Sequence, residues 1–393
     1  MSGTTGRRAV LLILDGVGIG GARDASAYGD AGSDTLGNTA RAVGGFDLPH
    51  LESLGLGTLA PIQGLSADVV GAAARTSLQP VSAGKDSTTG HWELCGVVLD
   101  RPFPTFPQGF PPDAIAEFAR LTGRPVIGNV VGSGTAIIER FGAEQVRGGG
   151  LIVYTSADSV FQVAAHEAVV PLDELYRACE AARAMLVAPN DVSRVIARPF
   201  EGTVVEGFRR TPRRRDFSIA PVGETLLDAL AQAGIRREGV GKVDDLFAGR
   251  AITSQHTADN ADGIAHIREW MVGEESGFLF ANLVDFDQLY GHRNDVAGFY
   301  GALRQFDRAL PSLLSALRED DLLFITADHG NDPTTPSTDH ARERVPVLIA
   351  GSSVRPVRLP ERQSFADVGA TVSEWFGLSF RGPGSSFLPE IIA

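Results

Sequence analysis

Four short apolar runs, each closed by a turn or by polar residues, limit most strongly how this 393-residue chain can fold. Runs of this kind are typical of strands that are buried on both faces, as in parallel sheets. Helical patterns accompany them, among others over residues 303–317 and 365–376. Strands that alternate with helices predict a doubly wound α/β sheet. The four predicted parallel strands are Arg8–Leu14, Phe278–Val284, Leu322–Thr326 and Val345–Ile349.

The middle of the chain has an alternation of its own. It opens at about Arg101 with the Pro- and Phe-rich stretch RPFPTFPQGFPP and ends near the arginine-rich FRRTPRRRDF. We therefore expect a smaller α/β domain, residues 101–217, inserted into a core built from residues 1–100 and 218–393. Its predicted elements are helices over 113–121 and 172–186 and strands over 125–129, 151–155 and 193–198.

Residues that bind metals follow three of the predicted core strands. Ligand sites in open α/β sheets lie at the carboxyl ends of the strands, so residues far apart in sequence can converge there. Mixed carboxylates and imidazoles suit Mn²⁺, Zn²⁺ or Fe²⁺ better than Ca²⁺. Six such residues are too many for one catalytic metal and suit two metals about 4 Å apart, as in phosphoryl transfer. The candidates are Asp15, Asp287, His292, Asp328, His329 and His340.

Each of these six residues also has an ordinary explanation when it is taken singly. An aspartate after a strand is often a helix N-cap, and a lone histidine is more often a surface or core residue. Because the six share a position at strand ends, the metal site explains the set better than six separate coincidences do.

The segment VSAGKDSTTGHWELCG holds a candidate nucleophile, Ser87, and a second candidate catalytic residue, Lys85. A serine hydroxyl is a weak nucleophile unless a metal or a base activates it, and a helix start favours a bound phosphate. GKDS is not a nucleotide-binding P-loop, because Gln79 replaces the first glycine and Asp86 follows the lysine. The G-x-G-x-x-G pattern in DGVGIGG is by itself weak evidence for dinucleotide binding, and a dinucleotide site would leave the six candidate metal ligands unexplained.

Composition narrows the classes of function. The net charge of −13 argues against nucleic acid as a partner, because phosphate backbones require a broad basic surface. No apolar run approaches the ~18–20 residues that span a bilayer, and residues 9–14 are too short a run for a signal peptide. Cys95 and Cys179 form no metal-binding pattern and are expected to be reduced core residues. We therefore expect a cytoplasmic protein that requires no nucleic acid, membrane or oligomer.

Taken together, these segments resemble the phosphopentomutase family of the alkaline phosphatase superfamily. The resemblance covers nearly the whole chain, and the combination of TSADS, RVIARPF and GKDSTTGHWE is specific. It implies an alkaline-phosphatase-like doubly wound core with the middle domain as a cap, and interconversion of ribose or deoxyribose 1- and 5-phosphates. Further segments that carry the resemblance are LDGVGIGGARDASAYGDAGSDTLGN, NLVDFDQLYGHRND and ITADHGNDPTTPSTDH.

The resemblance also implies which residues bind metal and carry phosphate. Ser87 falls at the position of the phosphorylated nucleophile, where many family members have threonine; Thr88 and Thr89 are its neighbours. One Mn²⁺ would be bound by Asp15, Asp328 and His329, and the other by Asp287, His292 and His340.

Substrate contacts follow from the same resemblance. Lys242, in GVGKVDD, matches a core lysine near the substrate. Of the five arginines in FRRTPRRRDF, only one or two are expected to touch phosphate, because charge runs are usually solvated. The expected contacts from the cap are Ser156, Asp158, Val160, Arg194, Ile196 and Arg210.

The implied mechanism begins with phosphate on Ser87, which passes to the sugar and gives ribose 1,5-bisphosphate. The other phosphate then returns to Ser87, and glucose 1,6-bisphosphate or a similar sugar bisphosphate primes the cycle. Three alternatives are a cofactor-independent phosphoglycerate mutase, which shares the spacing of Ser87 and His91, a phosphatase of the superfamily, and a non-catalytic binding protein.

Overall fold

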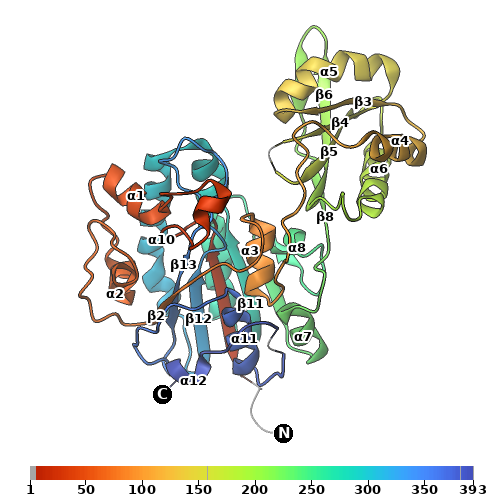
Figure 1. Ribbon diagram of the computed structural model, residues 1–393. Coiled ribbons are helices and arrows are strands. Elements are labelled where there is room, and N and C mark those ends of the chain that lie inside the picture. The colour runs from red at the N-terminus through yellow and green to blue at the C-terminus, as the bar shows by residue number, and fades with distance from the viewer. Residues whose placement is uncertain (1–5, 157, 381, 393) are drawn as a thin grey trace. The chain divides into compact units, whose positions relative to one another are not determined.

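The computed structural model describes residues 6–156, 158–380 and 382–392, which form two compact units (Figure 1). Unit 1 joins Met1–Pro102 to Pro221–Ala393, and unit 2 is Phe103–Ala220. The first five residues of the expected core, and Ala157 within TSADS, lie outside the described residues. Within the described ranges, no helix is both long enough and apolar enough to cross a membrane.

Unit 1 is built around a seven-stranded sheet with the order β10-β9-β11-β1-β12-β13-β2. The central strand β1 pairs in parallel with β11 and β12, and Ile13 lies in register with Asn282 and Thr326. The carboxyl ends of these three strands therefore meet at one edge of the sheet. The strands are β1 (Arg8–Leu14), β2 (Ala74–Leu78), β9 (Arg237–Val240), β10 (Ser254–Gln255), β11 (Gly277–Leu283), β12 (Asp321–Thr326) and β13 (Val345–Ala350).

Helices cover both faces of this sheet (Figure 1). One group consists of α1 (Thr35–Ala42), α2 (Pro49–Leu54), α9 (Asn260–Val272) and α10 (Val296–Leu314), which pack against one another. The other consists of α3 (Ser87–Leu94), α7 (Leu226–Gln232), α8 (Val243–Leu246) and α11 (Ala366–Trp375). Shorter turns are η1 (Ala25–Tyr28), η2 (Leu56–Thr58), η3 (Phe286–Tyr290), η4 (Gly291–Arg293) and α12 (Leu388–Ile391).

The predicted α/β class is confirmed, with one correction to the core strands. The predicted strand Val345–Ile349 exists as β13, but it runs antiparallel to both β12 and β2, so its predicted parallel direction is wrong. A parallel neighbour requires a crossover connection, whereas residues 327–344 contain no helix and lead the chain directly back beside β12. Strand β2 was not predicted, because its sequence, ARTSL, is polar in the middle. All five of its residues are nevertheless buried.

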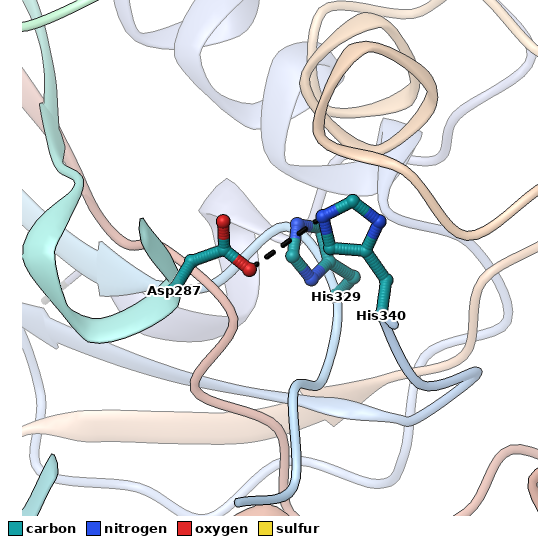
Figure 2. Close-up of side chains that lie close together, drawn as sticks. All are labelled: Asp287, His329 and His340. Carbon is teal, nitrogen blue, oxygen red and sulfur yellow. Dashed lines mark ion pairs between the residues drawn. The ribbon is translucent and has the colours of Figure 1, made fainter. Parts of the chain in front are cut away.

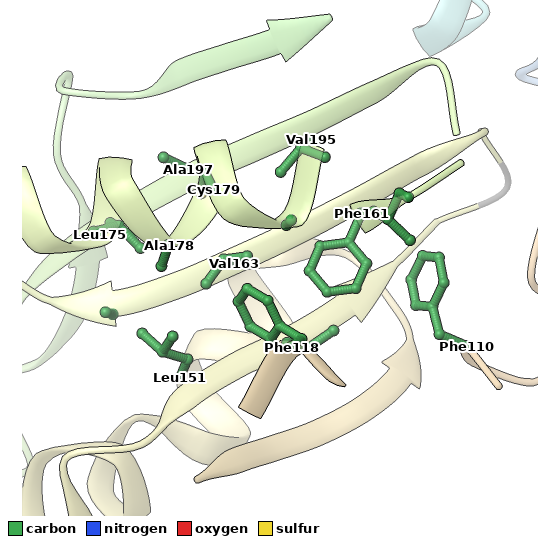
Figure 3. Close-up of a cluster of buried hydrophobic side chains, with 14 of the residues drawn as sticks. Phe110, Phe118, Leu151, Phe161, Val163, Leu175, Ala178, Cys179, Val195 and Ala197 are labelled. Carbon is green, nitrogen blue, oxygen red and sulfur yellow. The ribbon is translucent and has the colours of Figure 1, made fainter. Parts of the chain in front are cut away.

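Unit 2 has a separate sheet with the order β3-β4-β5-β6-β7, and β8 pairs with β6. One hydrophobic cluster lies between this sheet and helices α4 and α6, and in it the ring of Phe161 contacts those of Phe110 and Phe118 (Figure 3). A second cluster, around Ile137 and Tyr154, packs under α5 on the other face. The elements are α4 (Pro112–Thr122), β3 (Val126–Val131), α5 (Gly134–Gly148), β4 (Leu151–Thr155), β5 (Val160–His166), α6 (Leu172–Met185), β6 (Arg194–Thr203), β7 (Gly207–Arg210) and β8 (Arg215–Ser218).

Candidate active site

The three central strands of unit 1 deliver acidic side chains and histidines to one edge of the sheet. Asp15 follows β1 directly, and Asp328 and His329 follow β12. After β11 the chain enters a π-helical turn, η3, which carries Asp287, and η4, which carries His292. Single π-helical turns are found frequently at functional sites, because they re-aim side chains relative to an ordinary helix.

A first group of possible metal ligands consists of Asp15, Asp328 and His329, whose ligand atoms lie within 4.8 Å of one another. Nε2 of His329 is 3.3 Å from Oδ1 of Asp15 and 3.3 Å from Oδ2 of Asp328. Within the described part of the chain, neither oxygen accepts a hydrogen bond although both are buried. Buried carboxylate oxygens without donors fit a bound cation, so this group suits a metal ion.

A second group consists of Asp287, His329 and His340, whose side chains converge in Figure 2. Oδ1 of Asp287 is 3.5 Å from Nε2 of His340, and Oδ2 is 3.1 Å from Nε2 of His292. All six residues proposed from the sequence therefore lie together. The compact group contains His329 where the expected second set has His292. His292 contacts the other carboxylate oxygen of Asp287, and its ring centre lies 4.7 Å from that of His340.

Hydrogen bonds at Nδ1 leave Nε2 of two histidines available for a metal. Nδ1 of His292 is 2.6 Å from the carbonyl oxygen of Thr338, and Nδ1 of His329 is 3.0 Å from that of Gly330. A carbonyl can only accept, so Nδ1 carries a hydrogen, and Nε2 is the ring nitrogen that faces the carboxylates and would bind a metal.

The buried carboxylates of the site raise the pKa of the basic group beside them. Burial would lower the pKa of His329, but Asp328 and Asp15 raise it to about 10. Burial would raise the pKa of Asp15, but Lys242 holds it well below its usual range, with Nζ 2.9 Å from Oδ2. The carboxylates thus stay ionised and favour positive charge beside them, on His329 and Lys242 or as a metal ion.

Ser87 is the first residue of α3 and is only 8% exposed. Its Oγ lies 3.1 Å from Nε2 of His329, so the hydroxyl faces the ligand groups. Asp86 caps the helix by accepting hydrogen bonds from the Thr89 amide at 3.1 Å and the Thr89 hydroxyl at 2.6 Å. The cap fixes the first turn and therefore the position of Ser87.

Lys85 points to a different set of partners. Its Nζ lies 2.9 Å from Oδ1 of Asp30 and 3.5 Å from Oδ2 of Asp339, which is adjacent to His340. The lysine therefore forms ion pairs beside the ligand groups, and its ammonium group joins the loop before Ser87 to the segment that holds His340.

Three polar residues that support the ligands were not proposed from the sequence. Nδ2 of Asn282 donates to Oδ2 of Asp15 at 3.0 Å, and Nδ2 of Asn331 donates to Oδ1 of Asp287 at 2.7 Å. Nδ1 of His91 donates to the carbonyl oxygen of Ser87 at 2.8 Å and lies 3.1 Å from Oδ2 of Asp328. Asn282 had a sequence signal, because it is the one polar residue in the buried strand GFLFANL.

The residues proposed for substrate binding in unit 2 gather around the α5 face of its sheet. Val160 pairs in register with Arg194, and Gln162 with Ile196, so these side chains share one face of β5 and β6. Ser156 and Asp158 lie in the connection between β4 and β5.

Arg210 differs from the other arginines of FRRTPRRRDF. Its NH2 donates to the neutral Thr135 hydroxyl at 2.7 Å, at the amino end of α5. Nearby Arg198 donates to the neutral Gln162, and burial, with Arg214 next in importance, lowers the pKa of Arg198 to about 10. The other arginines of this stretch form ion pairs with acidic residues: Arg209 with Glu201, Arg213 with Glu167, Arg214 with Asp216 and Arg215 with Glu180.

An α/β core with two overlapping carboxylate–histidine groups and a buried serine defines a metal-dependent enzyme. A family model described as the Metalloenzyme superfamily matches residues 7–380, and the chain belongs to that superfamily. A Pyrococcus horikoshii protein of solved structure shares the fold, with a TM-score of 0.50 and 15% identity over 96% of this chain and 98% of that one.

Within this class, the chain belongs to the phosphopentomutase family. It is 54% identical to the phosphopentomutase of Carboxydothermus hydrogenoformans over 387 residues, which cover 98% of this chain and 99% of the relative. It is 52% identical to the phosphopentomutase of Acetivibrio thermocellus over 390 residues, which cover 98% of this chain and all of the relative. The family resemblance stated from the motifs is therefore confirmed.

Proposed function

We infer that this chain is a phosphopentomutase, an isomerase that interconverts the 1- and 5-phosphates of ribose or deoxyribose. Family membership supplies the reaction class. The observation that carries the chemistry is the contact of 3.1 Å between Oγ of Ser87 and Nε2 of His329, a residue that belongs to both ligand groups. A hydroxyl in this position suits transfer of a phosphoryl group to and from the protein.

Ser87 is the proposed phosphate carrier, ahead of Thr88 and Thr89. The Thr89 hydroxyl is committed to Asp86 as part of the helix cap, whereas the Ser87 hydroxyl faces His329. The amino end of α3 favours the negative charge that a phosphoserine would bring.

Six residues of unit 1 are proposed to hold two metal ions: Asp15, Asp287, His292, Asp328, His329 and His340. When bound, the ions supply positive charge that stabilises the transferring phosphoryl group and lowers the pKa of the attacking oxygen. Lys242 keeps Asp15 ionised and orients it through the contact at Nζ.

Unit 2 is proposed to act as the cap, residues 101–217 in the sequence prediction, and to bind the phosphate that is not being transferred. Arg210 and Arg198 support this role, because both donate to neutral side chains and retain charge for an anion. Arginine suits phosphate through bidentate hydrogen bonds. The other contacts proposed there are Ser156, Asp158, Val160, Arg194 and Ile196. A sugar 1,5-bisphosphate would form after the first transfer and reorient before the second.

Several finer parts of the proposal rest on the family resemblance. They are manganese as the bound metal, glucose 1,6-bisphosphate or a similar sugar bisphosphate as the activator, and a cytoplasmic location. The net charge of −13 supports small sugar phosphates rather than nucleic acid as partners.

The test is conversion of ribose 1-phosphate to ribose 5-phosphate by the purified chain with Mn²⁺ and a trace of glucose 1,6-bisphosphate. We expect Ser87→Ala to abolish the conversion and Thr88→Ala, which leaves the adjacent hydroxyl intact, to retain it. Phosphopeptide mapping should place phosphate on Ser87. Release of free ribose and inorganic phosphate would identify a phosphatase instead, and activity that survives in Ser87→Ala would exclude this nucleophile.

A further inference from the structure

The loop that leads into Ser87, residues 80–86, has no helix or strand to set its shape. It must nevertheless hold the serine within hydrogen-bonding distance of His329, because small displacements of a reacting group slow transfer strongly. We propose that Arg342 is the positioning residue for Ser87 and that it locks the nucleophile loop to the segment that carries His340. This role rests on the proposed function, in which Ser87 is the nucleophile.

The Arg342 side chain is 3% exposed and uses all five of its N–H donors. NH1 donates to the carbonyl oxygens of Ser82 and Gly84, both at 2.6 Å, and NH2 donates to that of Pro80 at 3.1 Å. The remaining donors form a fork with Asp24, in which Nε and NH2 are each 3.0 Å from one carboxylate oxygen. Three alternate carbonyls of one short loop thus point at a single guanidinium.

A buried carboxylate binds the backbone amides of the same loop, as the guanidinium binds its carbonyl oxygens. Glu93, on the same helix as Ser87, accepts hydrogen bonds from the amides of Val81 at 3.0 Å and Ser82 at 2.7 Å. Its other acceptor sites are taken by the Ser364 hydroxyl and the Phe365 amide. Because one charge holds the carbonyls and the other holds the amides, the backbone of this loop has a single well-satisfied conformation.

Arg342 lies in the segment that carries His340, two residues after that histidine. Ala341, between His340 and Arg342, exchanges two backbone hydrogen bonds with Gly330, the residue after His329, at 2.6 and 3.0 Å. Arg342 therefore connects the nucleophile loop to residues adjacent to His329 and His340, two of the proposed metal ligands. Tyr28 completes the enclosure, because the guanidinium lies 4.7 Å from its ring centre and the Gly84 amide donates to its hydroxyl at 3.3 Å.

The kinetic signature of this role differs from that of a substrate-binding or purely structural residue. In Arg342→Ala the loop carbonyls lose their donors, and Ser87 is no longer held against the ligand groups. We expect kcat to fall about 100-fold, the loss that a misplacement of about 1 Å produces. The KM for ribose 1-phosphate and the metal content should change little, because no substrate-binding or metal-type residue is removed.

The experiment compares Arg342→Ala with Arg344→Ala in the full chain. Arg344 lies two residues further along the same segment and pairs with Glu361 at 3.2 Å. Its other side-chain hydrogen bond goes to the carbonyl oxygen of Ile19, so within the described residues its guanidinium is bound outside the nucleophile loop. Mutase kinetics, metal content and hydrogen exchange of residues 81–86 are measured for each. We expect only Arg342→Ala to lose kcat and to exchange faster in this loop, and added guanidinium to restore part of its kcat.

Several outcomes would overturn the proposal. They are an unchanged kcat in folded Arg342→Ala, a loss explained entirely by missing metal, or equal effects in Arg344→Ala. If Arg342→Ala does not fold, Arg342→Lys keeps the charge but cannot replace the five-donor fork, and a normal kcat and normal exchange in it would overturn the proposal. Wild-type protein without mutase activity would refute the proposed function, whereas loop exchange would still decide whether Arg342 holds the loop.

Discussion

At the scale of single residues, buried charges in unit 1 differ in whether an opposite charge accompanies them. Arg342 has Asp24, and Asp15 has Lys242. Glu343, 1% exposed, accepts hydrogen bonds instead from neutral groups: the amide and hydroxyl of Thr35 and the amide of Gly20. Burial raises the pKa of Glu343 to about 7, although these hydrogen bonds act in the opposite direction.

The raised pKa of Glu343 predicts a stability that depends on pH. From its ordinary value of 4.5 up to about 7, the unfolded chain has released the proton that the folded chain retains. Stability should therefore fall as pH rises through this window, by at most about 1.4 kcal/mol per pH unit, and level off above it. Denaturant unfolding of wild type and Glu343→Gln across the window measures the difference.

The control for Glu343 is a glutamate whose pKa moves in the other direction. Burial would raise the pKa of Glu361, but hydrogen bonds from Gln79, Arg344 and Arg23 lower it below 4.5. Relative to Glu361→Gln, wild type should lose stability as pH falls below that value. A flat difference for Glu343→Gln between about pH 4.5 and 7 would contradict the assignment.

At the scale of elements, the start of α3 combines stability with placement of the nucleophile. Asp86→Ala removes the N-cap, which should cost about 1 kcal/mol in the free energy of unfolding, and should also lower kcat because the first turn holds Ser87. Asp259→Ala is the matched control, since Asp259 caps α9 through the same contact with the third residue, at 2.8 Å. We expect both variants to lose stability by chemical denaturation, Asp86→Ala somewhat more because it also loses the Thr89 hydroxyl, but an activity loss only in Asp86→Ala. Equal activity in the two variants would refute a role for the cap in catalysis.

The parts of the site that the sequence predicts are those that local patterns determine. Asp15 and Asp328 could be placed because each follows the end of an apolar strand within two residues, and Ser87 because a helix begins at it. Asn282 and Arg342 could not be assigned, because their partners lie 267 and 262 positions away and only the folded sheet brings them together. The predicted direction of β13 was wrong because its apolar run fits a parallel or an antiparallel strand equally well. The direction is set by the connection from β12, which the apolar pattern does not describe.

At the scale of the whole molecule, the two units have separate sheets and separate hydrophobic clusters. All six metal-type residues belong to unit 1, so metal binding should stabilise that unit selectively. A ligand present at 100 times its Kd contributes about 2.7 kcal/mol per site to the state that binds it. Removing the metals should therefore unfold unit 1 under milder conditions and leave unit 2 unaffected.

The two cysteines allow this prediction to be measured, because each unit contains one. Cys95 in unit 1 and Cys179 in unit 2 are both free and fully buried, and burial raises the pKa of each thiol, so neither should react with thiol reagents until its unit opens. With chelator present, Cys95 should become reactive at a lower denaturant concentration, and Mn²⁺ should reverse the shift, while the midpoint for Cys179 stays constant. Single-cysteine variants, Cys95→Ser and Cys179→Ser, separate the two signals. A common shift of both thiols would mean that the units unfold as one cooperative body, and no shift of either would mean that the metals act on catalysis without contributing to stability.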